Sequence, residues 1–262
     1  MSVNEKMTAI ADNIRSKTGG TKALTLDGMA SGVNEVYEAG KTKEWSDFWD
    51  VLQVNGTRAN YYYGFYSDTA GAWNDVNFKP KYDLKPSTID RFLRYSRITN
   101  LKEICEKQGI VFDTSNCTKF GLSFGDCASL EVVPAIDISK ATASNSTLNM
   151  FNEDRKLHTI EKLIVSENTL FDSPFKNCTL LSNIIFEGVI GRSISFSASP
   201  LTVASMKSII THLKNYSGTT DEFKYSLTLT SACKTSLEAE GTTSPNGNLW
   251  TEYVSDLGWN LV

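Results

Sequence analysis

The segment Gly121-Leu-Ser123-Phe-Gly125 has the spacing Gly-x-Ser-x-Gly. That spacing can hold a serine nucleophile on a sharp turn between a strand and a helix, and catalysis then needs a downstream acid and a histidine. His158 and His212 are the only histidines of the chain. A repeated pattern around the motif already accounts for its phenylalanine and second glycine, so we do not assign an esterase.

The other chemically active residue types form no recognisable site pattern. Gly40-Lys41-Thr42 has the spelling of the end of a phosphate loop, but Glu35 stands where that loop needs glycine. Paired acids for glycoside cleavage cannot be picked out among the many carboxylates. The cysteines lack Cys-x-x-Cys spacing, which argues against zinc; they are Cys105, Cys117, Cys127, Cys178 and Cys233. We therefore predict a protein that is not an enzyme and holds no metal or cofactor.

A repeat supplies the elements that must position these residues. Three stretches read Phe-x-x-Cys-x-x-Leu or a close variant and begin at Phe124, Phe151 and Phe175. A looser copy begins at Tyr95 and continues through Ile98, Leu101 and Ile104. Successive copies start 29, 27 and 24 residues apart, which is the range of stacked repeats. Such repeats favour an extended binding surface over an enclosed catalytic pocket.

The spacing of three within each copy predicts a helical turn with Phe, Cys and Leu on one side. The aliphatic segment that follows predicts a short strand, at Val132–Ile138 with an interruption at Pro134, at Lys162–Val165 and at Asn183–Phe186. We expect adjacent copies to pair these strands in parallel and to align their apolar residues in internal columns. Asp154 replaces Cys in the second copy. The predicted repeat core is Phe124, Cys127, Leu130, Phe151, Leu157, Phe175, Cys178 and Leu181.

Residues 1–40 are expected to form an N-terminal helical segment that can oligomerise. An apolar seam steps by four, three and four residues through Val3, Met7, Ile10 and Ile14. A helix this short is marginal alone in water, so it must pack on something else. A homo-oligomer is one expected solution.

Residues 41–90 are rich in aromatic side chains, and we interpret them as an N-terminal cap over the open end of the repeats. The alternative is a platform on which sugar rings stack. The candidate ligand-contacting aromatics of that platform are Tyr61, Tyr62, Tyr63, Tyr66 and Trp73.

Residues 201–262, which follow the repeat region 91–200, are expected to form a C-terminal α/β cap. Apolar spacing predicts a helix at Thr202–Lys214, and alternation predicts a strand at Lys224–Thr230. A second helix is expected from Ala232, another near Leu249–Leu257, and a short strand at the end of the chain. We expect these strands to continue the parallel sheet of the repeats.

Charge and hydropathy exclude several partners. The net charge is −4 and the pI is about 5.4, so no basic face is indicated for nucleic acid. No apolar run approaches the length of a membrane span, and the first residues lack the apolar region of a secretory signal. We expect synthesis in a reducing cytoplasm, with no membrane insertion.

The copies at Phe124, Phe151 and Phe175 resemble BspA-type leucine-rich repeats, an irregular class found in bacterial surface proteins and prophage genes. The segment after Leu201 and the Gly258-Trp259 ending are similar to the tail that often closes such repeats in phage-encoded proteins. The resemblance implies an α/β fold, namely a short irregular leucine-rich-repeat solenoid with parallel strands.

The segment from Ile10 to Met29 resembles a leader of tail and baseplate proteins from phages of Gram-positive bacteria, and Trp73–Tyr82 is similar to a stretch beside that leader. This implies a phage or prophage virion protein at the tail. Residues 1–40 would contact tail proteins, and the repeats would bind a host surface protein or glycan. The alternatives are a bacterial cell-surface adhesin or partner-binding repeat protein, and a tailspike depolymerase.

Overall fold

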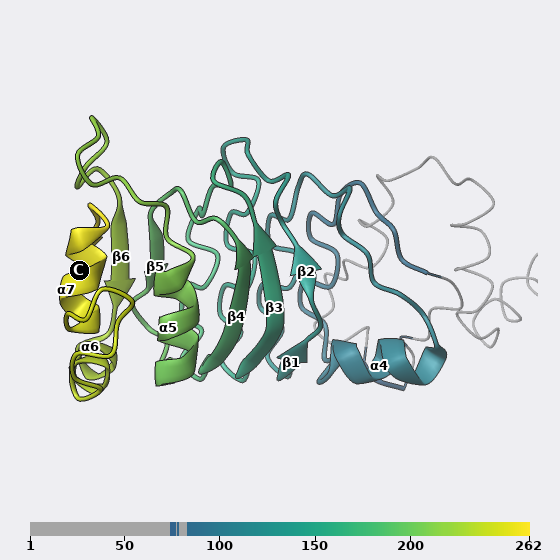
Figure 1. The fold of residues 1–262 in the computed structure, drawn as a ribbon. Coiled ribbons are helices and arrows are strands. Elements are labelled where there is room, and N and C mark those ends of the chain that lie inside the picture. The colour runs from purple at the N-terminus through teal and green to yellow at the C-terminus, as the bar shows by residue number, and fades with distance from the viewer. Residues whose placement is uncertain (1–73, 77, 79–82) are drawn as a thin grey trace, which may run out of the picture. The chain divides into compact units, whose positions relative to one another are not determined.

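The computed structural model describes residues 74–76, 78 and 83–262, which form a mixed α/β arrangement of short parallel strands and four helices. These elements are α4 (Leu101–Gln108), β1 (Val132–Val133), β2 (Ile136–Asp137), β3 (Thr159–Val165), β4 (Asn183–Gly188), β5 (Ile194–Phe196), α5 (Val203–Thr211), β6 (Ser226–Leu229), α6 (Ser231–Glu238), α7 (Trp250–Asp256) and β7 (Asn260–Leu261). Figure 1 shows them arranged from α4 at one end through β3 and β4 to β6, α6 and α7 at the other.

The predicted segments 1–40 and most of 41–90 lie outside the described residues. So do the predicted oligomer seam and the candidate aromatic platform. Among the helices that are described, none is long and apolar enough to cross a membrane.

The strands of successive copies pair in parallel, as predicted. β1 and β2 both pair with β3, and β3 pairs with β4. The register places Val133, Ile160 and Ile184 in one row, and all three are buried. The predicted interruption at Pro134 is present: the segment forms two short strands, β1 and β2, because Pro134 between them has no N–H to give to a ladder.

Helices end this sheet on both sides. Asn100 forms a bridge to Val132, and α4 begins at the next residue. On the other side α5 lies beside β4 (Figure 1). The N–H groups of Ile184 and Phe186 donate to the hydroxyls of Ser205 and Ser208 on α5, both over 2.9 Å. Serine side chains thus replace the carbonyls of a further strand.

The expectation that the C-terminal strands continue the same sheet is therefore wrong. β5, β6 and β7 form a separate parallel sheet. The predicted C-terminal helices and strands themselves are present, and α5 and α6 begin where Thr202 and Thr230 accept from N–H groups of the first turn. Trp259 is fully buried, and its Nε1 donates to the Lys214 carbonyl over 2.8 Å.

On the side opposite the strands, each copy forms consecutive turns and not the predicted helical turn. Leu122, Asp126, Asn149 and Glu153 have φ between 52° and 64°, so left-handed residues recur every few positions. This conformation interrupts a right-handed helix. It turns alternate N–H groups toward the next copy, and those of Leu122 and Asp126, for example, donate to Leu148 and Asn152.

A column of phenylalanine rings runs through the copies. Phe124 and Phe151 stack with centroids 5.1 Å apart, Phe151 and Phe175 with 5.9 Å, and Phe175 and Phe196 with 4.7 Å. The rings are within 15° of parallel in each pair. Phe92 meets Phe124 edge-on at 6.4 Å. The copies are therefore spaced by ring stacking as well as by backbone hydrogen bonds.

A second, polar column lies beside the phenylalanines. All of its members are buried: Ser96, Cys127, Asp154, Cys178, Ser199 and Cys233. Thiols and hydroxyls here donate to main-chain carbonyls of the preceding copy, as the Cys127 Sγ does to Leu93 over 2.9 Å and the Cys178 Sγ does to Phe151 over 3.0 Å. The column also extends past the predicted copies into α6 through Cys233.

The predicted start of the first copy at Tyr95 is wrong. The N–H of Glu131 donates to the Thr99 carbonyl, and the N–H of His158 donates to the Glu131 carbonyl in the same way. Thr99 and Glu131 therefore occupy equivalent positions in successive copies, which aligns Ile98 with Leu130. Leu101 and Ile104 belong to α4 instead. A further copy, which the sequence did not predict, begins at Phe196. The distance from this phenylalanine to Leu201 is one residue shorter than the Phe-to-Leu distance of the other copies, so the pattern was hidden.

Candidate functional site

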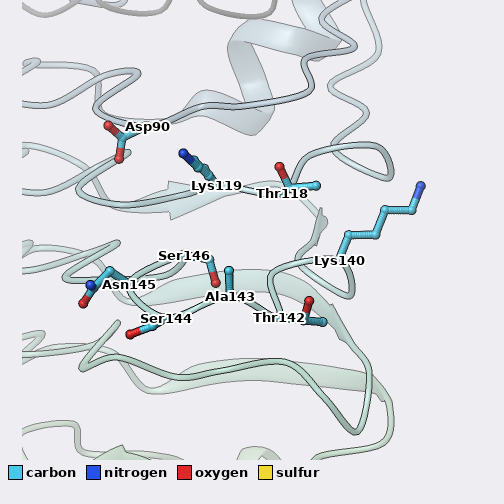
Figure 2. A pocket seen from close by; sticks show the side chains of 9 residues that line it. All are labelled: Asp90, Thr118, Lys119, Lys140, Thr142, Ala143, Ser144, Asn145 and Ser146. Carbon is cyan, nitrogen blue, oxygen red and sulfur yellow. The ribbon is translucent and has the colours of Figure 1, made fainter.

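An open polar cleft lies on the loops that precede the turns. Its volume is about 370 Å³, at the lower end of the range for ligand pockets. The residues that line this cleft are Asp90, Thr118, Lys119, Lys140, Thr142, Ala143, Ser144, Asn145 and Ser146. Figure 2 shows Asp90, Thr118 and Lys119 on one side and residues 142–146 on the other.

Backbone hydrogen bonds between copies hold the walls of the polar cleft. The N–H of Ile89 donates to the Lys119 carbonyl over 2.9 Å, and the N–H of Phe120 donates to the Ser146 carbonyl over 2.6 Å. Three consecutive copies therefore contribute to the cleft. Since Phe120 is fully buried and Ile89 is too, the walls rest directly on the core.

Gly121 makes room for the Asp90 carboxylate. A Cβ on this glycine would lie 2.6 Å from Asp90 Oδ1, too close for any real contact. A larger residue at position 121 would therefore displace the Asp90 side chain.

Asn145 is displayed by a left-handed backbone, with φ of 63°. Asparagine tolerates this conformation better than most residues. Its N–H donates to the Asp172 carboxylate over 2.6 Å, and Asp172 in turn is held through its own N–H by the Thr147 hydroxyl. The next copy therefore fixes the position of this corner of the cleft.

Two charged side chains of the cleft, like several other exposed charged groups of the described chain, have no protein partner. Lys119 and Asp90 make no ion pair or side-chain hydrogen bond with any described residue, and Lys140 Nζ donates only to the neutral Asn116 amide, over 2.7 Å. On the strand side, by contrast, Lys162 pairs with Glu187 over 2.7 Å, and Lys102 pairs with Glu161 over the same distance.

The arrangement suits the binding of a polar molecule. Carboxylate oxygens accept hydrogen bonds, ammonium groups donate them, and amide and hydroxyl side chains do both. Among the described residues, no group of three or more His, Cys, Asp or Glu side chains is placed to hold a metal ion.

The serine of the Gly-x-Ser-x-Gly motif and the two histidines form no catalytic arrangement with one another. Ser123 is fully buried and its hydroxyl donates to the Phe120 carbonyl. His158 Nδ1 lies 2.9 Å from the Thr159 hydroxyl, and His212 Nδ1 lies 2.7 Å from the Ser208 carbonyl. Neither histidine contacts Ser123, so the structure does not bring these residues together.

The cysteines are all free and buried. Burial raises the pKa of the Cys105 and Cys117 thiols to about 12, and it raises the pKa of Cys178 still further above its ordinary value. Since the thiolate is the reactive form, these thiols are poor nucleophiles in the folded chain.

The structure places the predicted repeat core inside and the cleft residues outside. All eight of the predicted core residues named above are buried. Sequence reasoning did not find the polar cleft. Lys119, Thr142 and Asn145 belong to ordinary Ser-, Thr- and Lys-containing loops, and only the stacking of copies brings them together.

No protein-family model matches the chain, and none of the curated proteins or solved structures compared with it is significantly similar.

Proposed function

We propose that this chain is a non-enzymatic, tail-associated virion protein of a phage or prophage that attaches to the host cell surface. In this proposal the stacked copies are a short, irregular leucine-rich-repeat solenoid, and the polar cleft is its binding site. The observation that carries the proposal is the cleft itself, which gathers exposed polar side chains from three successive copies.

The chemistry of the cleft favours binding over cleavage. Glycoside hydrolysis by the paired-acid mechanism uses two carboxyl groups on either side of the scissile bond. Of the described residues that line the cleft, Asp90 alone is acidic. This supports a receptor-binding role in preference to that of a tailspike depolymerase.

Attachment to the particle is assigned to residues 1–40, with Val3, Met7, Ile10 and Ile14 as the oligomer seam. Symmetric appendages multiply weak contacts, because a second binding event within one particle is intramolecular. A modest affinity at each cleft would then be enough to hold a virion on a cell.

Two measurements test the proposal. Gold-labelled antibody against residues 91–200 should mark the tails of virions from the phage or prophage that encodes the chain, and labelled full-length chain should bind whole cells of its host. Unlabelled virions together with specific binding to cells would favour a cell-surface adhesin. Release of sugars from the host envelope by the purified chain would favour the depolymerase.

The cleft is tested by a triple variant that combines D90A, K119Q and N145A. We expect it to lose binding to cells, whereas a control on the strand side, K162Q with E187Q, should bind normally. Equal binding by both variants would remove the cleft from the proposal and would leave the attachment role to another surface.

A further inference from the structure

We infer that Asp154 makes the stack of copies sensitive to pH. While its carboxyl holds a proton, the copy of Asp154 stays packed against its two neighbours, and loss of the proton lets these copies separate. The inference goes beyond the proposed function, because it holds whatever ligand the chain binds. It depends on where the carboxyl lies, on the groups that face it and on its position in the polar column.

The carboxyl of Asp154 lies wholly inside the stack. The residue is 0% exposed, its Oδ1 accepts from the Cys127 N–H of the preceding copy over 2.8 Å, and its Oδ2 has no partner among the described residues. In the protonated form this is a neutral group with one oxygen unsatisfied. In the ionised form it is a buried charge, which costs far more free energy unless a cation or further donors compensate it.

The groups that face Asp154 cannot compensate a negative charge. They are the thiols of Cys127 and Cys178 from the two neighbouring copies and the carboxylates of Asp126 and Glu153. A thiol is a weak hydrogen-bond donor, and a carboxylate repels a second one. Ionisation therefore brings a third negative charge close to two others.

Both neighbouring carboxylates have a cation of their own, whereas Asp154 has none among the described residues. Arg94 pairs with Asp126 over 3.1 Å, and Arg155 pairs with Glu153 over 2.7 Å. These arginines are held by the more exposed acids and form no ion pair with the buried one. Asp154 thus differs from both acids beside it in burial and in pairing.

The polar column explains why ionisation acts on the contact between copies. The Cys127 and Cys178 thiols donate to main-chain carbonyls of the preceding copy and so link neighbouring copies. Asp154 occupies the same column, but it has a hydrogen to donate only while it is protonated. Cysteine fits this position in the copies on either side, so the carboxyl is a local exception. Exceptions of this kind are expected where a position has a use besides stability.

The direction of the pH effect follows from the two forms of the stack. Burial raises the pKa of the Asp154 carboxyl well above its ordinary value while the copies are packed. Once they separate, the carboxyl meets water and regains an ordinary pKa of about 4. The packed form is therefore favoured most at low pH. As pH rises from the ordinary pKa to the raised one, the equilibrium constant for separation grows about tenfold per pH unit.

The cysteines of the column report the separation. Cys127 and Cys178 are fully buried on either side of Asp154, so a thiol reagent reaches them only when the copies part. Cys233 is also buried, but it lies three positions beyond Asp154 in the column, beside Ser199. It therefore serves as an internal reference for opening that does not involve Asp154.

The test labels the full-length chain with dithiodipyridine from about pH 4 to about pH 8 and locates each labelled cysteine by peptide mass spectrometry. The measured quantity is the labelling rate of Cys178 divided by that of Cys233 in the same sample. The ordinary pH dependence of thiol reactivity affects both rates and cancels in the ratio. We expect the ratio to rise about tenfold or more over this range in the wild type.

The variant D154N shows whether the carboxyl is responsible. Asparagine has the same shape, keeps an oxygen for the Cys127 N–H and always has hydrogens to donate, but it does not ionise. We expect a ratio that does not change with pH in D154N. The same is expected of D154S, which places at this position the residue type of Ser199. The control E153Q removes a neighbouring carboxylate and should keep the rise.

Four outcomes would overturn the inference. These are a wild-type ratio that does not change with pH, a Cys178 thiol that is never labelled, a rise as large in D154N and D154S as in the wild type, and loss of the rise in E153Q. Melting temperatures at low pH establish that the variants are folded before they are labelled.

Discussion

The phenylalanine column and the polar column beside it run through the same copies, but they are held together in different ways. Phe124, Phe151 and Phe175 fill their positions by size and stack on one another. The polar column accepts Ser, Cys or Asp, because each position needs only a small group that bonds to the backbone. One column therefore depends on the shape of its side chains and the other on local hydrogen bonding.

Asp154 is where the polar column is least well satisfied. Its Oδ1 accepts from the Cys127 N–H over 2.8 Å, while its Oδ2 is buried and has no partner among the described residues. Burial raises the pKa of this carboxyl well above its ordinary value, and the neighbouring charges of Asp126 and Glu153 raise it further. Both effects favour the protonated form of Asp154 in the folded chain.

The largest effect is expected in the phenylalanine column. Phe175→Ala should lower the free energy of unfolding by about 3–5 kcal/mol, because the ring is buried between two stacked neighbours and leaves a cavity. Urea unfolding at neutral pH measures this. Phe223→Ala is the control, since Phe223 is 50% exposed and its loss should cost less than about 0.5 kcal/mol. Similar losses for both would show that the column is not tightly packed.

The next effect is expected at Asp154. Asp154→Cys should raise the free energy of unfolding at neutral pH by about 1–3 kcal/mol, the usual cost of a buried polar atom without a partner. The raised pKa means that the folded wild type keeps a proton that the unfolded chain releases. The wild type is therefore most stable at low pH. It loses free energy of unfolding as pH rises from the ordinary carboxyl pKa through the raised pKa of Asp154 in the folded chain.

The advantage of Asp154→Cys over the wild type should accordingly grow with pH above the ordinary carboxyl pKa. Unfolding curves across the acidic to neutral range measure it. Glu131→Gln serves as the control, because its side chain forms no hydrogen bond or ion pair within the described residues. An advantage that shrinks as pH rises would show that Asp154 is charged in the folded chain.

The smallest effect is expected from exchanges that keep a hydrogen-bond donor in the polar column. Cys178→Ala removes the bond to the Phe151 carbonyl and should cost about 1 kcal/mol. Cys178→Ser keeps a donor of the kind already present at Ser199, so it should cost less. Thermal unfolding of the pair measures the difference. A serine variant less stable than the alanine variant would mean that sulfur size decides this column as well.

The sequence predicted the spaced apolar residues well and the backbone between them poorly. Phe124, Leu130 and Ile160 recur at intervals that imply burial whatever the local conformation. A spacing of three is shared by a helical turn and by consecutive turns with left-handed residues. Inter-copy bonds such as that from Leu122 to Leu148 select the turns, and they are not visible in one copy.

The irregular first and last copies were misplaced for a related reason. Phe196 and Ile98 lie in the stack. In their copies, however, one residue fewer separates the member of the polar column from the aliphatic residue that follows it. Pattern matching treats such a deletion as a mismatch, whereas a ladder of backbone bonds accommodates it.

The sequence by itself determined the interior: the buried phenylalanines and leucines, the parallel pairing of the short strands and the helices of the C-terminal segment. These follow from apolar spacing, which reports burial directly. Only the tertiary structure decided where the sheet ends, which loops meet in the polar cleft and which lysines remain without an acidic partner. Such features depend on residues from different copies, and their proximity is set by stacking and not by spacing along the chain.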